Sequence, residues 1–179
     1  LKNKTNFLFP IVYLVMWGVT LISISQASTA YQIPSKEQAK EFVESILKEG
    51  LQIANDPNAN EHDLGDLLSR KAVIKEIARF ILGQHARQMT SQQLDEFCEL
   101  YQRRLIRTYS TSEKLKTFRG TSYTIDEKGI SEQSDRTMLV KTYLTFKDNP
   151  NSEPAKVYWK VVMKDGKLYV FDILFEGIS

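Results

Sequence analysis

Apolar residues recur every three or four positions in the first half of this chain and every second position in the other half. The wider spacing, between residues 35 and 109, is typical of amphipathic helices, and the alternation after residue 119 is typical of strands. Helices followed by an antiparallel meander is the order found in α+β domains. The pattern therefore predicts an α+β fold with N-terminal helices packed on a C-terminal antiparallel sheet.

Three helical segments are expected in the first half, at about 35–56, 61–82 and 90–109. Capping boxes predict the starts of the first and third, because Ser35 and Thr90 are each followed three positions later by Gln. The second segment is expected to break near Ser69 and to end at Gly83.

Five strand segments are expected in the second half. Turn sequences separate them, and Lys164-Asp165-Gly166-Lys167 predicts a hairpin. Another turn is expected at Glu127-Lys128-Gly129. The expected strands are 121–126, 129–133, 137–146, 157–163 and 168–175.

The N-terminal segment 1–30 has the order of a secretory signal peptide. Lys2 and Lys4 precede an uncharged run over residues 7–25, and small residues follow it. Cleavage after Ala27 or Ala30 would leave a mature protein that begins at Ser28 or Tyr31, with residues 31–179 as one exported domain. An uncleaved anchor is the alternative, since the uncharged run approaches the roughly 20 residues that span a bilayer.

The charge of the chain argues against a nucleic-acid-binding protein, because 24 Lys and Arg are balanced by 22 Asp and Glu. Residues 67–119 are the basic part, with 11 basic and five acidic side chains. Within it, Arg103, Arg104 and Arg107 are candidates for contact with anionic headgroups or an acidic docking surface. A solvated helix face is the alternative.

No catalytic or metal-ligating motif stands out in the sequence. The two histidines, His62 and His85, have no ligand spacing, and the single cysteine, Cys98, is expected to be a buried apolar side chain. Asp172 interrupts an apolar strand, so it is a candidate for a perturbed carboxylate or for a buried hydrogen-bond acceptor. The sequence therefore predicts no enzyme, no metal and no cofactor.

Two apolar surfaces are expected to face each other, one on the sheet and one on the third helix. They form either a filled core or the walls of a slot, and periodicity does not distinguish the two. Residues two apart share a sheet face, and residues four apart share a helix face. The sheet residues are Val140, Leu144, Val157, Trp159 and Val161, and the helix residues are Phe97, Tyr101 and Leu105.

Two stretches of the chain resemble the MlaC family of periplasmic phospholipid-binding, or toluene-tolerance, proteins. Residues 80–109 contain a Leu-Gly pair, a Thr-x-x-Gln cap, spaced aromatic residues and a closing Thr-Tyr, and residues 157–179 contain Val-Tyr-Trp, Asp-Gly-Lys and a terminal Glu-Gly-Ile-Ser. Ala86 and Leu168 replace aromatic residues that are usual in the family. Relatives usually continue beyond the position of Ser179 through a further segment with a terminal helix, which leaves two alternatives: a C-terminal truncation of this sequence, or a cavity without that wall.

The resemblance implies a monomeric carrier in which a strongly curved sheet encloses an apolar pocket. The cargo would be a glycerophospholipid, held by the eight residues of the two facing surfaces, with no other cofactor. The partners would be an outer-membrane lipoprotein complex and an inner-membrane ABC transporter with an MCE-domain subunit, and the transport would maintain outer-membrane lipid asymmetry. A small exported enzyme and a solid-core adaptor without lipid cargo are the alternatives.

Overall fold

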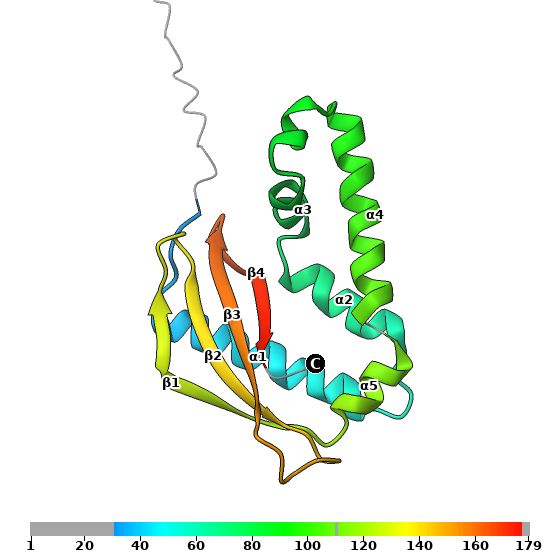
Figure 1. Cartoon of the computed structure of the whole chain (residues 1–179), viewed down its shortest axis with the longest axis vertical. Helices are drawn as coiled ribbons and strands as arrows, with labels where there is room; N and C mark the ends of the chain where they lie inside the picture. The colour runs from blue at the N-terminus through cyan, green and yellow to red at the C-terminus, as the bar shows by residue number, and fades with distance from the viewer. Residues whose placement is uncertain (1–30, 110, 177–179) are drawn as a thin grey trace, which may run out of the picture.

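The computed structural model describes residues 31–109 and 111–176. The predicted signal peptide and the last three residues lie outside this part. Figure 1 shows a twisted four-stranded sheet, with the first helix against one of its faces and the other helices to the side of its last strand. Among the described residues, no helix combines the length and the apolar character needed to cross a membrane.

Helix α1, Lys36–Asn55, begins at the predicted capping box. The Gln38 amide donates to the Ser35 hydroxyl at 3.1 Å, and the Ser35 amide donates to the Gln38 side-chain oxygen at 2.9 Å. Both contacts satisfy donors that the first turn would otherwise leave unpaired. The apolar stripe of α1 is buried, and its members are Ala39, Val43, Ile46, Leu47 and Ala54.

The second predicted helix is two helices, α2 (Glu61–Lys71) and α3 (Ile74–Leu82), and the break lies at Ala72–Val73 rather than near Ser69. Ser69 lies inside α2, where its hydroxyl donates to the Gly65 carbonyl one turn earlier at 2.9 Å. At the break, the Val73 amide instead donates to the Val170 carbonyl of the last strand, at 3.1 Å. This hydrogen bond to the last strand therefore determines where the helix breaks.

A 3₁₀ segment, η1 (Gly83–Gln88), leads into helix α4, Ser91–Tyr109. The predicted capping box of Thr90 and Gln93 is present. Helix α4 packs on α2 and α3. The α2–α4 contact is close at Gly65, where an added Cβ would lie 2.8 Å from the Ile106 side chain. A short helix that the sequence pattern did not predict, α5 (Ser112–Phe118), follows.

The strands are β1 (Ser122–Glu132), β2 (Met138–Thr145), β3 (Ala155–Lys164) and β4 (Lys167–Glu176), paired antiparallel in chain order. The prediction of two short strands before residue 133 is wrong, because β1 is one strand with a bulge after Asp126. The Asp126 carboxylate accepts from the amides of Lys128 and Gly129, which satisfies the backbone inside the bulge. The hairpin at Asp165–Gly166 is confirmed, with φ of 51° and 73°.

One face of the sheet packs on α1 and forms the core of the molecule. Strands β2 and β3 alternate between buried and half-buried residues along most of their length, as expected of a sheet with one covered face. The α+β class is confirmed, and the sheet curls without closing.

Candidate functional site

The five sheet residues predicted to line a slot lie inside the core. Val140, Val157 and Val161 have no exposed surface, Leu144 is 4% exposed and Trp159 is 7% exposed. They belong to one cluster with Ala39, Val43, Ile46 and Leu47 of α1. Protein atoms of α1 therefore cover this face.

The polar group of Trp159 is also satisfied within this core. Its indole nitrogen donates to the Thr142 hydroxyl at 3.0 Å, and that hydroxyl donates to the Val157 carbonyl at 3.3 Å. Thr142 itself is fully buried. A buried hydrogen-bonded pair of this kind fixes the indole against the sheet.

The three helix residues lie on α4, away from the sheet core. Phe97 and Tyr101 stack on each other with ring centroids 6.3 Å apart, and Leu105 is half-buried near the α2 and α3 contacts. The predicted apposition of the third helix on the sheet is wrong, because α1 occupies that place. Both helices carry an apolar stripe, and periodicity does not indicate which of them the sheet will bury. Lipid contact by these eight residues stays a prediction.

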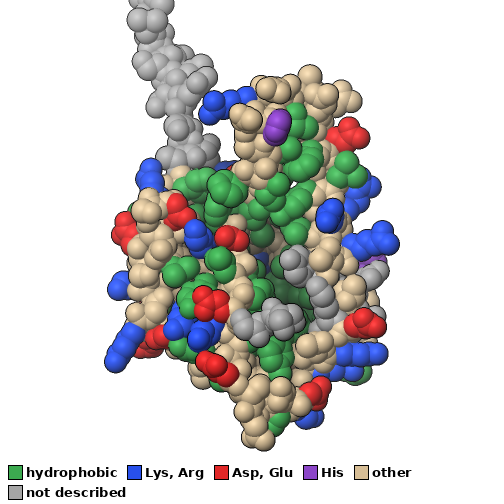
Figure 2. Space-filling view, viewed as in Figure 1, with side chains coloured by type: hydrophobic (Ala, Val, Ile, Leu, Met, Phe, Trp, Pro, Cys, Tyr) green, Lys and Arg blue, Asp and Glu red, His purple; other side chains and the backbone are tan. Residues whose placement is uncertain are grey.

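The open apolar surface lies elsewhere, in a recess between β4 and the helices α2–α4. Figure 2 shows hydrophobic side chains at the bottom of this recess and on the helical side beside it. On β4, Ile173 and Phe175 pair with Trp159 and Val157, so they share the core face of the sheet. Ile173 is half-buried and Phe175 is 42% exposed. The core face therefore continues into the recess at the end of β4.

Helices α3 and α4 supply the other wall. Lys75 of α3 forms an ion pair with Asp95 of α4, which marks one edge of this helix pair. Helical spacing places the half-buried Ile77 and the 55% exposed Ile81 on the opposite edge of α3, and it places the Phe97–Tyr101 stack on the same edge of α4. We call the recess together with these apolar side chains the apolar recess. Helical and strand spacing assign to it Ile77, Ile81, Phe97, Tyr101, Ile173 and Phe175.

Two contacts join α3 to the sheet at one end of the apolar recess. The Phe80 ring meets Phe171 of β4 edge-on, with centroids 6.0 Å apart, and Phe171 also meets Tyr31 at 6.4 Å. Lys164 of β3 forms an ion pair with Glu76 of α3. The hydrogen bond to Glu76 raises the pKa of Lys164, and burial, followed by the charge of Glu76, raises the pKa of Tyr31.

The three arginines predicted for headgroup or partner contact are exposed on α4. Arg103, Arg104 and Arg107 surround Leu100, which is 52% exposed, on the side of α4 that faces away from α2 and α3. Among the described residues, none of the three forms an ion pair. Their role stays a prediction.

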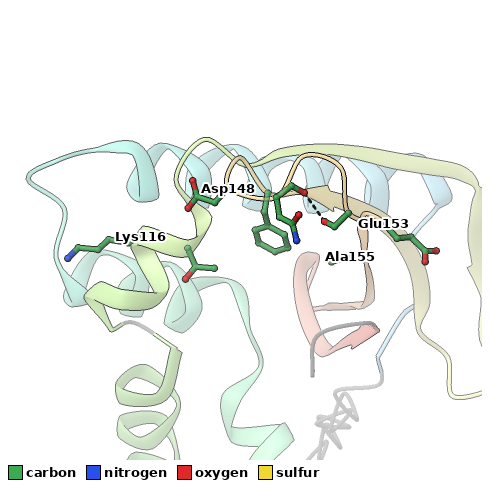
Figure 3. Close-up of a pocket in the computed structure, with 8 residues that line it drawn as sticks. Lys116, Asp148, Glu153 and Ala155 are labelled. Carbon is green, nitrogen blue, oxygen red and sulfur yellow. Dashed lines mark hydrogen bonds between the residues drawn. The ribbon is translucent and has the colours of Figure 1, made fainter.

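A second hollow, of about 500 Å³, lies between α5 and the loop that joins β2 to β3 (Figure 3). Its walls mix Phe146 and Ala155 with charged and amide side chains, including Lys116, Asp148 and Glu153. The loop is held by a 2.7 Å hydrogen bond from the Ser152 hydroxyl to the Asn149 carbonyl. None of the eight predicted lipid-binding residues lines it.

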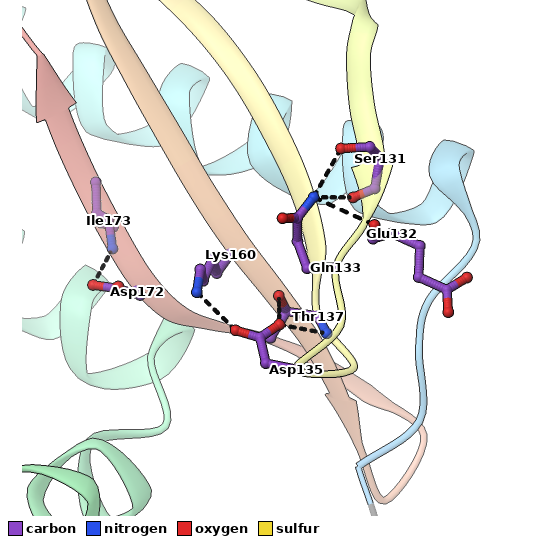
Figure 4. Close-up of polar contacts among 8 residues, drawn as sticks. All are labelled: Ser131, Glu132, Gln133, Asp135, Thr137, Lys160, Asp172 and Ile173. Atoms are coloured by element: carbon purple, nitrogen blue, oxygen red, sulfur yellow. Dashed lines mark hydrogen bonds and ion pairs between the residues drawn. The ribbon is translucent and has the colours of Figure 1, made fainter.

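Asp172 is exposed, which contradicts the expectation of a carboxylate buried in the strand. The register pairs it with Lys160 on the face away from α1, and its carboxylate accepts from the neighbouring Ile173 amide at 2.9 Å (Figure 4). Lys160 instead reaches Asp135, at 2.7 Å, in the turn between β1 and β2. Asp172 is therefore not enclosed by apolar side chains.

Cys98 is buried, as predicted, and burial raises the pKa of its thiol. His62 and His85 are exposed. Within residues 31–109 and 111–176, no group of three or more His, Cys, Asp or Glu side chains is arranged to hold a metal ion.

Sequence reasoning missed the most exposed apolar residues near the recess. Phe80 is 74% exposed, Ile81 is 55% exposed and Phe175 is 42% exposed. Helical spacing puts Ile81 on the apolar side of the expected helix 61–82, and Phe175 ends the expected strand 168–175, so both fit the patterns of their elements. A signal was available in α3, where Phe80 and Ile81 are adjacent and so face different sides of the helix.

The comparison with known proteins agrees with this fold. A structure of the phospholipid-binding protein from Ralstonia solanacearum, in complex with a phospholipid, is similar to this chain with a TM-score of 0.63 and 21% sequence identity. The similarity covers 78% of this chain and 79% of that one. No curated protein matches the chain. Residues 36–179 match the family described as MlaC protein, which is nearly all of the domain after the predicted signal peptide. The chain therefore belongs to the MlaC family.

Proposed function

We propose that this protein binds a glycerophospholipid in the apolar recess and carries it between membranes. The observation that carries the proposal is the family match over residues 36–179. The similar structure from Ralstonia solanacearum is described as a phospholipid-binding protein, which supports the same cargo class. The recess supports it physically, because its walls are apolar and open rather than filled by protein.

The free energy of exposing the acyl chains to water determines how much of them the recess must cover. Two acyl chains contain about thirty methylene groups, and exposing them to water costs about 24 kcal/mol at roughly 0.8 kcal/mol each. A carrier must therefore cover most of both chains. The recess offers one wall from β4 and one from the α3–α4 pair, so a chain lying between them contacts protein on two sides.

We extend this proposal to the route of transport. The signal-like N-terminus favours a periplasmic carrier that moves phospholipid between an outer-membrane lipoprotein complex and an inner-membrane ABC transporter with an MCE-domain subunit. Such transport would maintain outer-membrane lipid asymmetry. The enzyme alternative loses support because Asp172 is exposed. The solid-core adaptor remains an outcome of the experiment below.

The experiment uses two neighbouring residues of β4 with similar exposure and opposite faces. Phe175, 42% exposed, is on the recess face, and Leu174, 45% exposed, is on the other face. We expect gently purified wild-type protein to release phospholipid on organic extraction. Phe175→Ser should lower the lipid recovered per folded molecule, and Leu174→Ser should leave it unchanged. No lipid in the wild type, together with no binding of added phospholipid, would establish the adaptor.

A further inference from the structure

The tip where α3 turns into α4 carries positive charge without any negative charge. Residues 77–94 include Arg79 and Arg87 and contain no Asp or Glu. Of the nearest acids, Glu76 pairs with Lys164 and Asp95 pairs with Lys75, which leaves the single carboxylate of Glu96 against the two arginines. Among the described residues, neither arginine forms an ion pair, and both are exposed. The field at the tip is therefore cationic.

The same tip exposes the two most accessible large apolar side chains of the described structure. Phe80 is 74% exposed and Ile81 is 55% exposed, directly after Arg79. Figure 1 shows the α3–α4 turn projecting beyond the end of the sheet, with η1 at its summit. The exposed face of Phe80 is thus available to a surface that meets the molecule end-on. Its edge contact with Phe171 links the tip to β4, at the end of the apolar recess.

This combination fits a lipid bilayer better than a protein partner. An aromatic and an aliphatic side chain beside arginines is the chemistry of elements that lie in the interface of an anionic membrane. Two side chains at the end of a narrow turn can insert between headgroups. They fall far short of the roughly 800 Å² per partner that a stable protein interface buries.

We propose that the α3–α4 tip is a membrane-contacting element that binds an anionic phospholipid surface through Phe80, Ile81, Arg79 and Arg87. The proposal deepens the proposed function and rests on it, because contact at the tip would place the apolar recess beside the membrane that holds the lipid donor or acceptor. The recess supplies cover for the cargo, and the tip supplies the docking to the membrane.

The test is co-sedimentation with vesicles of phosphatidylglycerol and phosphatidylcholine, compared with vesicles of phosphatidylcholine alone. The protein is purified from the cells that produce it, with its N-terminus left as those cells process it. Each arginine near an anionic surface contributes about a fivefold factor in binding, so the double variant Arg79→Gln/Arg87→Gln should bind about 25-fold more weakly. The double variant Phe80→Ser/Ile81→Ser should lose about tenfold or more. Leu174→Ser is the matched control, since Leu174 is 45% exposed on the face of β4 away from the recess and should bind vesicles as the wild type does.

Extracted phospholipid, measured on the same preparations, separates this proposal from the proposed function. We expect the arginine variant to keep its cargo while vesicle binding falls, and we expect added salt to weaken vesicle binding of the wild type. The proposal is overturned if the wild type does not bind anionic vesicles, or if all variants bind equally. It is also overturned if the tip variants bind vesicles normally and fail only to bind a protein partner. Cargo absent from every preparation would instead remove the proposed function.

Discussion

A single valine on β3 shows the difference between a core position and a cargo position. Val161 has no exposed surface and lies in the cluster that α1 completes, whereas Ile77 on α3 is only half-buried at the edge of the apolar recess. Both are aliphatic, and both follow the periodicity of their elements. The two positions differ in how much of the side chain is covered by protein atoms, so substitution by a larger side chain should have different effects at them.

Val161→Trp should overpack the core and destabilise the fold by about 1–3 kcal/mol. Phospholipid per folded molecule should stay unchanged, because protein and not cargo contacts this residue. Urea unfolding and lipid extraction of one preparation measure both quantities. Ile77→Trp is the matched variant, and it should leave the unfolding free energy nearly unchanged while it lowers bound lipid. A stable Val161→Trp protein that has lost its lipid would return the cargo to the sheet face.

Between elements, α3 is tied to the sheet by an ion pair that titrates. Hydrogen bonding to Glu76 raises the pKa of Lys164 above its ordinary value of 10.5. Because the folded-state pKa is the higher one, the stabilisation is complete below pH 10.5 and is lost as the pH rises through the raised pKa. The pair therefore stabilises the molecule over the whole neutral range.

Glu76→Gln should destabilise the protein by an amount that is constant between about pH 7 and pH 10 and that shrinks at higher pH. The measurement is the difference in unfolding free energy between the wild type and the variant along a pH series. Glu132→Gln serves as the control, because the exposed Glu132 has no ion pair in the described part of the chain and its removal should give no such trend. A difference that persists unchanged well above pH 11 would show that Lys164 is not its source.

Local signals predicted the elements better than their partners. Both capping boxes and the Asp165–Gly166 hairpin are formed within a few residues, and the sequence patterns were sufficient to place them. The break at Ala72–Val73 and the bulge in β1 depend on hydrogen bonds to other groups of the fold. Strand alternation likewise identified the buried sheet face correctly. It could not show that α1 covers this face, since two helices had suitable stripes.

At the scale of the whole molecule, two bodies with different roles share one chain. The sheet and α1 form a packed core in which the buried apolar side chains contact one another. Helices α3 and α4 stand beside this core and leave apolar surface open between the two bodies (Figure 2). The family resemblance indicated a lipid carrier, and the family match agrees. The location of the open apolar surface, however, depends on which helix packs on the sheet. Periodicity does not determine this, so it could not predict the residues that face the open surface.

The Val73–Val170 hydrogen bond described above has a consequence for hydrogen exchange. Val73 lies at the junction of α2 and α3, and its amide is bonded across to the β4 carbonyl at 3.1 Å. A swing of α3 and α4 away from the sheet breaks this bond and the Lys164–Glu76 ion pair, but it leaves the backbone pairing of β3 with β2 and β4 intact. The Val73 amide should therefore exchange with deuterium through a low-energy opening, while the Trp159 amide exchanges only on global unfolding. Added phospholipid should slow exchange at Val73 and leave Trp159 unaffected, because cargo held between the two bodies opposes their separation. Equal protection at the two amides would instead show that α3 and the sheet open only together, as a single rigid unit.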